Sequence, residues 1–216
     1  MQPMMTNDLI TRLTGELKPV PRTAVIMRVA TGLGISLAAS AILMLLWLGM
    51  RPDLAEASTT MMFWTKFSYT LILAVAGAWA VKRIAHPLGS IRVNLGLMAG
   101  AIVVMIILAF AQLAMTPPDE YMAMLKGRTI AVCTFNIVIL SLPLLIGAFW
   151  VLRGLAPTRL TVAGAAAGLA AGAIAALVYS FHCFESAMPF IAVWYTLGVL
   201  VAGLIGAITG RFILRW

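Results

Sequence analysis

Charged residues are scarce in this chain of 216 residues. Only 10% of the residues are charged and 62% are hydrophobic, whereas soluble domains are about 25% charged and 45–50% apolar. The mean hydropathy of +1.04 points the same way. This composition excludes a water-soluble fold. The useful unit of length is therefore the membrane span, which takes about 20 mostly apolar residues.

The short motifs of enzyme chemistry are also missing. There is no CxxC, no HExxH, no glycine-rich phosphate loop and no GxSxG. The apolar runs carry no charge near their middles, which argues against an ion-coupled transporter, since such transporters use an acid or base within the membrane. We predict a non-enzyme with no resident cofactor. A small membrane transporter and a membrane thiol oxidoreductase remain the alternatives.

Six apolar runs predict an all-α membrane protein, a six-helix transmembrane bundle. Charged residues, proline or both interrupt the chain between the runs. No cleavable signal peptide is expected, because the first run is too long for one and starts only at Met27. Residues 1–26 form a tail and residues 27–216 the transmembrane domain, with predicted spans at 27–49, 67–81, 93–115, 130–152, 160–179 and 190–214.

The basic residues predict the orientation of the spans. Most of them fall on the side of the N-terminus, and cytoplasmic loops are the ones enriched in Lys and Arg. The segments on the other side hold Arg51, Lys66, Lys126 and Arg128. Both termini are therefore expected in the cytoplasm. The net charge of +8 is explained by topology, and no direct contact with nucleic acid is expected.

Two further patterns concern the spans. Aromatic residues near span ends are typical of the membrane interface: Trp47, Trp64, Trp150, Trp194, Tyr195 and Trp216. Glycines recur at every fourth residue in the last two spans, at Gly164, Gly168, Gly172, Gly206 and Gly210. Small residues at this spacing let helix backbones approach closely. They indicate either packing within the chain or a homodimer face.

The chain has only two cysteines, Cys133 and Cys183. The predicted topology places both on the outer side, where disulfides persist in bacteria. A permanent disulfide or two inert buried thiols is one interpretation. The other is a sensor that switches between thiol and disulfide, or between empty and metal-bound. His182 and Glu185 flank Cys183, so the four side chains together offer sulfur, nitrogen and oxygen ligands to a soft or borderline metal ion, although their spacing matches no established site.

The tail has the pattern of a short amphipathic helix. Thr6, Asn7 and Asp8 offer N-cap oxygens, and Lys18-Pro19-Val20-Pro21 ends the helix. An apolar stripe lies between them, at Leu9, Ile10, Leu13 and Leu17. Such a helix has no core of its own and needs lipid or a partner's groove. Its polar face has no net basic charge, which favours a cytosolic protein over anionic lipid.

Several segments along the chain resemble the NrsF family of bacterial six-span anti-sigma factors. They include Ala156-Pro157-Thr158-Arg159, the Ala163–Ala176 run, Tyr179 with His182-Cys183, Trp194–Gly198, Leu214-Arg215-Trp216, Cys133 and the tail from Asp8 to Val20. The resemblance implies an inner-membrane protein that sequesters an extracytoplasmic-function sigma factor. It also implies release under oxidant or heavy-metal stress, with Cys133 and Cys183 as the sensor. Sigma-factor-binding residues would be Leu9, Ile10, Leu13, Leu17, Pro19 and Val20.

Overall fold

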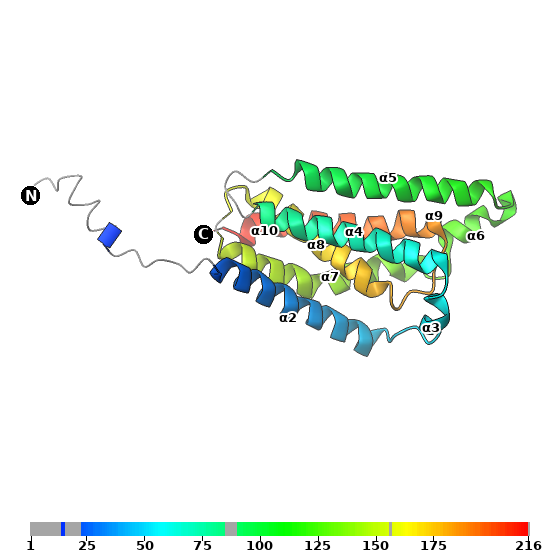
Figure 1. Cartoon of the computed structure of the whole chain (residues 1–216), viewed down its shortest axis with the longest axis horizontal. Helices are drawn as coiled ribbons and strands as arrows, with labels where there is room; N and C mark the ends of the chain where they lie inside the picture. Colours follow the sequence, from blue (N-terminus) through cyan, green and yellow to red (C-terminus); the bar gives the residue numbers. More distant parts are fainter. Residues whose placement is uncertain (1–13, 16–22, 85–89, 156, 216) are drawn as a thin grey trace, which may run out of the picture.

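The computed structural model describes residues 14–15, 23–84, 90–155 and 157–215, and these described residues are almost wholly helical (Figure 1). The proposed sigma-factor-binding residues Leu9, Ile10, Leu13, Leu17, Pro19 and Val20 lie outside this set. Among the described residues, six helical stretches are long and apolar enough to cross a membrane. The expectation of an all-α, six-helix membrane bundle is confirmed.

The long helices are α2 (Ala24–Trp47), α4 (Met61–Ile84), α5 (Arg92–Ala114), α7 (Ile130–Arg153), α8 (Leu160–Tyr179) and α10 (Thr196–Ile213). Short elements join them: α3 (Leu54–Ala57), the 3-10 turn η1 (Pro118–Glu120), α6 (Tyr121–Lys126), α9 (Met188–Phe190) and the π-helical turn η2 (Ile191–Tyr195). The sixth span is thus a continuous run through α9, η2 and α10, Met188–Ile213.

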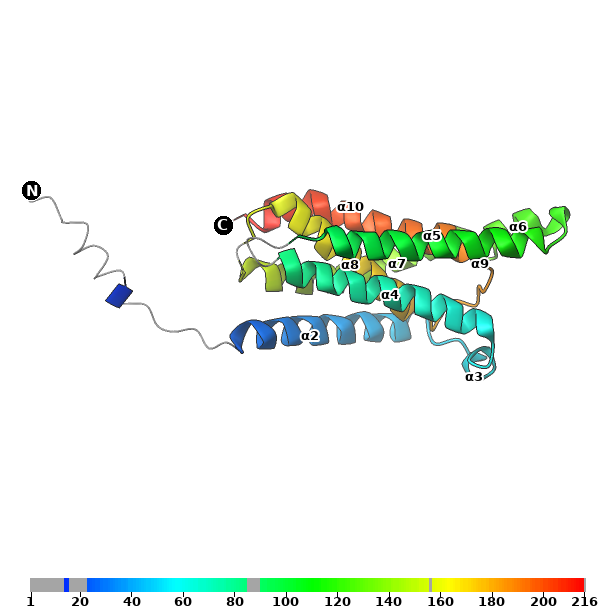
Figure 2. The same cartoon turned by 45° about the horizontal axis from the view of Figure 1, so that its top comes forward.

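Helix α8 forms the centre of the bundle. Two thirds of its apolar window, 67%, is buried, against 22% in α2 and in α5. It packs against α10, α4 and α7, while α2 lies mainly on α7 and α5 lies on α4 and near α9 (Figures 1 and 2). The reason is the composition of α8, which is mostly alanine and glycine. Small side chains on every face allow three neighbours to approach it at once.

The glycine ladder of the last two spans is used inside this chain. A Cβ atom on Gly164 would collide with the backbone oxygen of Gly206, and one on Gly168 with that of Ala202. A Cβ on Gly210 would lie 2.6 Å from the Cα of Gly164. Of the two interpretations of this ladder, packing within the chain is the one observed. The glycine ladder therefore no longer supports the expectation of a homodimer.

Two residues lie elsewhere than their residue type suggested. Helix α4 begins at Met61, before the predicted span 67–81, and includes Lys66, which the sequence analysis had assigned to an outer segment. Lys66 is instead 0% exposed inside the helix. Tyr195 was expected at the membrane interface but is also 0% exposed, within η2.

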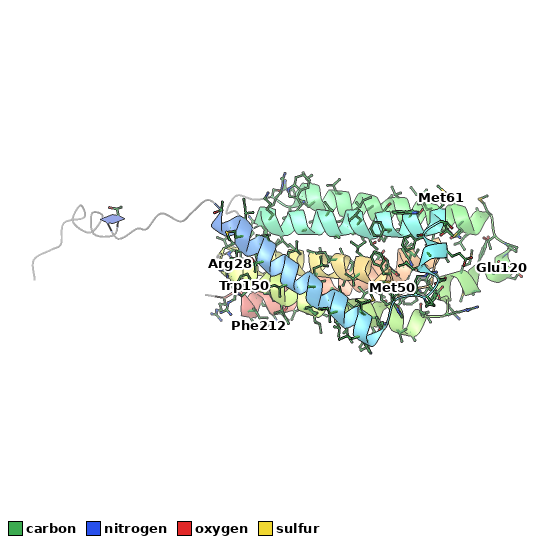
Figure 3. The ribbon with its side chains drawn as sticks, turned by 60° about the horizontal axis from the view of Figure 1, so that its bottom comes forward. Arg28, Met50, Met61, Glu120, Trp150 and Phe212 are labelled. Atoms are coloured by element: carbon green, nitrogen blue, oxygen red, sulfur yellow. The ribbon has the colours of Figure 1, made fainter. Side chains whose placement is uncertain are left out.

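The bundle has two ends that differ in content. Figure 3 shows Arg28, Trp150 and Phe212 at the end where α2 begins and α10 ends, here called the terminal end. Met50, Met61 and Glu120 lie at the opposite end, here called the distal end. Short elements α3, α6 and α9 also lie at the distal end (Figure 1). The polar contacts described next gather there.

Candidate functional site

The two cysteines lie side by side at the distal end. Cys133 stands in the first turn of α7, and Cys183 stands in the segment 180–187 between α8 and α9, here called the Cys183 loop. Both are free thiols, 0% and 1% exposed, and they lie close enough for Cys133 to be the largest influence on the pKa of the Cys183 thiol. The two cysteines are not paired with each other, so the permanent disulfide is not found, and the structure contains two buried thiols instead.

The Cys183 loop begins as an extension of α8. The backbone N–H groups of His182 and Cys183 both donate to the carbonyl oxygen of Tyr179, at 3.0 Å. The hydroxyl of Ser180 bonds back to Leu177 O at 2.6 Å. These bonds satisfy carbonyls that a helix end otherwise leaves without partners. They hold Cys183 close under the last turn of α8.

A buried lysine of α4 holds this loop by hydrogen bonds. The Nζ atom of Lys66 donates to the carbonyl oxygens of Cys183, at 2.8 Å, and of Glu185, at 3.0 Å. Among the described residues, Lys66 takes part in no ion pair within 4.0 Å. Burying an ammonium group costs several kcal/mol unless it is well bonded. The two carbonyls and the neighbouring Cys183 sulfur are therefore the groups that hold this charge.

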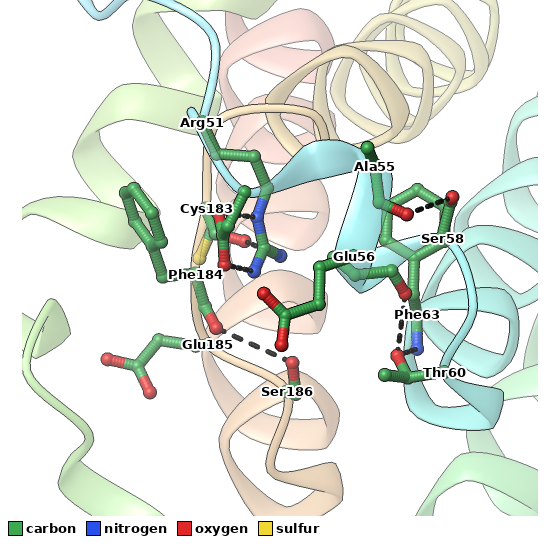
Figure 4. A network of polar contacts seen from close by, with 12 residues as sticks. Arg51, Ala55, Glu56, Ser58, Thr60, Phe63, Cys183, Phe184, Glu185 and Ser186 are labelled. Carbon is green, nitrogen blue, oxygen red and sulfur yellow. Dashed lines mark hydrogen bonds and ion pairs between the residues drawn. The ribbon is translucent and has the colours of Figure 1, made fainter.

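Arg51, in the segment between α2 and α3, also forms hydrogen bonds with this loop (Figure 4). Its backbone N–H donates to Phe181 O at 3.2 Å and its Nη1 to Cys183 O at 3.4 Å. Its guanidinium group also pairs with Asp53 at 2.7 Å and lies 5.1 Å from the ring centre of Phe184. The hydrogen bond from Arg51 holds the pKa of the Asp53 carboxyl below its usual range. Two cations thus converge on the Cys183 carbonyl.

This environment stabilises the ionised form of Cys183. The hydrogen bond from Cys133 is the main cause of a lowered pKa for the Cys183 thiol, and the charge of Lys66 and the hydroxyl of Tyr195 act in the same direction. Burial opposes them. A thiolate is the form of cysteine that attacks oxidants and binds metal ions. The surroundings of Cys183 therefore favour its thiolate form.

Aromatic rings enclose the pair on the side of α10. The ring centres of Tyr179 and Tyr195 are 5.8 Å apart, and His182 is 5.5 Å from Tyr179. The Tyr195 hydroxyl lies beside the Cys183 sulfur and has no well-formed hydrogen bond in the described part of the chain. Tyr195 ends the π-helical turn η2. Such turns occur frequently at functional sites, and this one follows directly on the Cys183 loop and α9.

The four proposed metal ligands do not form one site. The Nδ1 atom of His182 contacts the carbonyl oxygen of Gly49 at 2.9 Å, and Glu185 Oε1 accepts a hydrogen bond from the backbone of Arg128 at 2.6 Å. Within the described ranges, no three His, Cys, Asp or Glu side chains gather as a metal site would require. His182 and Glu185 instead tie the Cys183 loop to its neighbours. The residues do not fit a four-ligand metal centre, and only the two sulfurs remain together.

The Cys183 loop and the start of the sixth span also contact the last turn of α5 and the segment between α5 and α7. Gln112 Oε1 accepts a hydrogen bond from the Met188 backbone at 2.7 Å, and Trp194 Nε1 donates to Leu125 O at 2.9 Å. Gly127 has φ +55, and a Cβ there would meet Phe190 and Glu185. The connections between α2 and α4, and between α5 and α7, therefore both contact the Cys183 loop.

Sequence reasoning missed Lys66, Arg51 and Tyr195 as parts of this site. The charge of Lys66 between Phe63-Trp64 and Phe67 was a usable signal, because a lysine within an aromatic, apolar run needs polar partners. No sequence signal distinguished Tyr195 from the interfacial aromatics. The position of Tyr195 beside Cys183 depends on where along the sixth span η2 begins.

Comparisons with known proteins place the chain in a family. The family profile described as NrsF, negative regulator of sigma F, matches residues 13–216. The anti-sigma-F factor NrsF of Caulobacter vibrioides is 42% identical over 216 residues, which is 99% of this chain and 100% of that protein. The probable anti-sigma-F factor NrsF of Azospira oryzae is 36% identical over 213 residues, again 99% and 100%. No solved structure matches this chain. A profile match along nearly the whole chain and full-length identities above 30% show that this membrane protein belongs to the NrsF family of negative regulators, which are not enzymes.

Proposed function

We propose that this protein is a membrane anti-sigma factor whose two cysteines control the release of a sigma factor. The observation that carries the proposal is the position of the cysteines. The only two in the chain, 50 residues apart in sequence, lie close together at the distal end, whereas α2, the helix that follows the N-terminal tail in sequence, begins at the terminal end. The bundle thus separates a reactive site from a binding segment. The name of the Caulobacter relative, an anti-sigma-F factor, supports a sigma factor as the partner.

The proposed arrangement in the membrane follows the basic residues. The terminal end, with Arg28 and Arg153, faces the cytoplasm, and the distal end faces the outside of a bacterial inner membrane. The apolar stripe Leu9, Ile10, Leu13 and Leu17, followed by Pro19 and Val20, then occupies an apolar groove on an extracytoplasmic-function sigma factor and keeps it from RNA polymerase. An amphipathic helix in a groove is an established mode of peptide recognition.

The signal is an oxidant of the peroxide class. The Cys183 thiolate attacks a peroxide oxygen, which yields a sulfenic acid and, with one proton, water when the oxidant is hydrogen peroxide. The sulfur of Cys133 then attacks the sulfenic sulfur, forms the disulfide and releases a second water. In total, two thiols and one hydrogen peroxide give one disulfide and two waters. Because Cys183 is buried, the oxidant reaches it when the Cys183 loop opens.

Disulfide formation changes the distal end mechanically and electrostatically. An S–S bond is about 2.05 Å long, shorter than a hydrogen-bonded contact between two sulfur atoms, so oxidation draws α7 toward the Cys183 loop. It also removes the negative charge that Lys66 faces. The direct contact of two sulfurs would equally suit a soft metal ion, which is the second candidate signal.

The binding segment is tested by co-purification from detergent-solubilised membranes. Wild type should retain the sigma factor, and Leu9→Ala/Leu13→Ala should lose it, because the apolar stripe is removed. Thr11→Ala, on the opposite side of the helical pattern, is the matched control and should retain it. Equal recovery with the double variant would contradict the binding helix.

The signal is tested in the same preparation. Hydrogen peroxide, or cadmium ions in a parallel sample, is added to wild type, Cys133→Ser and Cys183→Ser, and the released sigma factor is measured. Release from wild type alone supports the thiol switch. Release by cadmium but not by peroxide would replace the oxidant with a soft metal. Normal release from both serine variants would exclude the cysteines as the sensor.

A further inference from the structure

We propose that Arg28 is a positioning residue that links the last turn of α7 to the N-terminal segment, so that a change at Cys133 reaches the sigma-factor-binding stripe through α7 and α2. The inference rests on the proposed function and adds the route by which the signal crosses the bundle. The juxtaposition that carries it is a single contact, Arg28 of α2 on Trp150 of α7, at the end of the bundle opposite to the thiols.

Helix α7 connects the two ends as one continuous element. Cys133 lies in its first turn and Trp150 in its last. At 1.5 Å per residue, the two residues stand about 25 Å apart along the axis. A displacement of the Cys133 end is therefore carried to Trp150, since helices move as packed units more easily than they deform.

Arg28 caps the far end of α7 from another helix. Its Nη2 atom donates to the carbonyl oxygen of Trp150 at 2.7 Å, and its guanidinium carbon lies 4.5 Å from the centre of the Trp150 ring. The last four carbonyls of a helix have no partner within it, and a cation at this end also interacts favourably with the helix dipole. A Cβ atom on Gly154 would overlap the guanidinium group of Arg28, so the glycine after α7 makes room for this cap.

The rest of α2 follows α7 closely. Ser40 Oγ donates to Leu140 O at 2.9 Å near the middle of the helices. A Cβ atom on Gly147 would lie 2.6 Å from the Cβ of Ser36, and one on Gly32 would lie 2.5 Å from a methyl group of Val151. These backbones are in close contact over several turns. Because α2 starts at Ala24, four residues before Arg28, a shift of α7 relative to the bundle moves the point at which the N-terminal segment begins.

A small cavity beside α2 and α7 leaves room for these two helices to pack in a second arrangement. It measures about 60 Å³ and lies between α2, α4, α7 and α8, with Leu33, Ser36, Gly147 and Ala171 among its lining residues. Its lining is mostly apolar, and apolar cavities of this kind stay dry. Two packings of similar energy are what a switch requires, and a void beside α7 lets the helix move without overlap.

The simpler explanation is that Arg28 only anchors α2 at the membrane surface. The chain contains a matched control for that explanation. Arg83 lies over the Trp79 ring, with its guanidinium carbon 5.2 Å from the ring centre, at the same end of the bundle. Both residues belong to α4, so this pair has the same chemistry but joins no two helices. If both arginines only anchor their helices, replacing either one should have the same effect on sigma-factor release. If Arg28 couples α7 to α2, only the replacement of Arg28 should reduce release.

The experiment uses full-length protein in membrane vesicles with the sigma factor bound. Wild type, Arg28→Gln, Trp150→Leu, Arg28→Lys and Arg83→Gln are treated with hydrogen peroxide. Three quantities are measured: the sigma factor retained before treatment, the sigma factor released after it, and the disulfide formed between Cys133 and Cys183. In Arg28→Gln and Trp150→Leu, the disulfide should form and the sigma factor should be retained as in wild type, but release should fall at least about fivefold, the lower bound of a typical allosteric coupling.

The remaining variants decide the interpretation. Arg83→Gln should release as wild type does, and Arg28→Lys should recover part of the release, because it restores a donor to Trp150 O. Unchanged release in Arg28→Gln would overturn the inference, as would an equal loss in Arg83→Gln. Loss of retention before treatment would overturn it too, since Arg28 would then act in binding. A wild type that forms the disulfide without release would instead contradict the proposed function itself.

Discussion

At the scale of single residues, the site depends on the hydrogen bonds that the buried ammonium group of Lys66 makes. Lys66 is enclosed in the distal end, and its ammonium group is bonded to two carbonyls of the Cys183 loop. The lysine holds the loop in place, and the loop in turn makes the burial of the lysine tolerable. The same contact brings a positive charge near Cys183. Structure and reactivity at this point therefore depend on one side chain.

Replacing Lys66 by methionine should destabilise the protein. The substitution leaves the carbonyl oxygen of Glu185 without its Lys66 donor and that of Cys183 with only the long bond from Arg51, and an unsatisfied buried group costs on the order of 1–3 kcal/mol. Thermal or denaturant unfolding in detergent measures the loss. Lys82→Met, near the other end of the same helix and exposed, is the control and should change stability by less than about 0.5 kcal/mol. Equal effects in the two variants would contradict the role of Lys66.

The pH dependence of Cys183 reactivity should depend on a donor at residue 133. The Cys133 hydrogen bond is the main cause of the lowered pKa of Cys183, so the thiolate persists to lower pH than an ordinary thiol's. Cys133→Ala removes this donor and should move the rise of the Cys183 alkylation rate to higher pH. Cys133→Ser keeps a donor and should keep the rise at lower pH.

Both variants contain Cys183 as their only thiol, so a small alkylating agent reports on it alone. The opening of the Cys183 loop limits access in both and does not alter the comparison. Identical profiles would show that the Cys133 hydrogen bond does not set the pKa of Cys183.

At the scale of helices, the decisive feature is the small size of the α8 side chains. The backbone contact of α8 with α10 depends on glycines on both helices, such as Gly168 and Gly206. This contact fixes the position of the end of α8, and thus of the Cys183 loop that follows it. Helix α5 is different. A Cβ atom on Gly96 or Gly100 would meet nothing within 4 Å, and the groove between α5 and α4 remains open.

Gly206→Leu should therefore separate α8 from α10. Overpacking a tight contact costs about 1–3 kcal/mol, and the thermal midpoint in detergent should fall accordingly. Gly100→Leu introduces the same side chain into open space on α5 and should leave the midpoint nearly unchanged. A comparable loss in the two variants would indicate that helix propensity, rather than packing, is responsible.

At the scale of the whole molecule, the proposal depends on the two ends facing different compartments. In a variant that lacks Cys133 and Cys183, single cysteines report the topology. Glu120→Cys, at the distal end, should react with a membrane-impermeant maleimide in intact cells. Arg153→Cys, at the exposed end of α7, should react only after the membrane is opened. The reverse pattern would invert the topology and would place the thiols in the cytoplasm.

The sequence predicted the fold well and the site only in part. The predicted span 160–179 coincides with helix α8, because hydrophobicity is a local property that adds along a window of residues. The same logic failed at Lys66, since a charge counts against a span unless its partners are known. Cys133 and Cys183 were expected on the same side, but nothing in the chain could say that His182 and Glu185 would bind elsewhere.

By itself, the sequence determined the helical class and the six candidate spans, and it predicted the cysteines on one side of the membrane and the tail on the other. The tertiary structure alone decided that the Cys133 thiol meets Cys183 and that Lys66 reaches the loop carbonyls. It also decided that Arg28 caps α7. The physical reason is that crossing a membrane depends on the summed transfer energy of neighbouring residues, whereas each of these contacts joins residues far apart in the chain. Such contacts exist only once α8 has allowed its neighbours to pack at backbone distance.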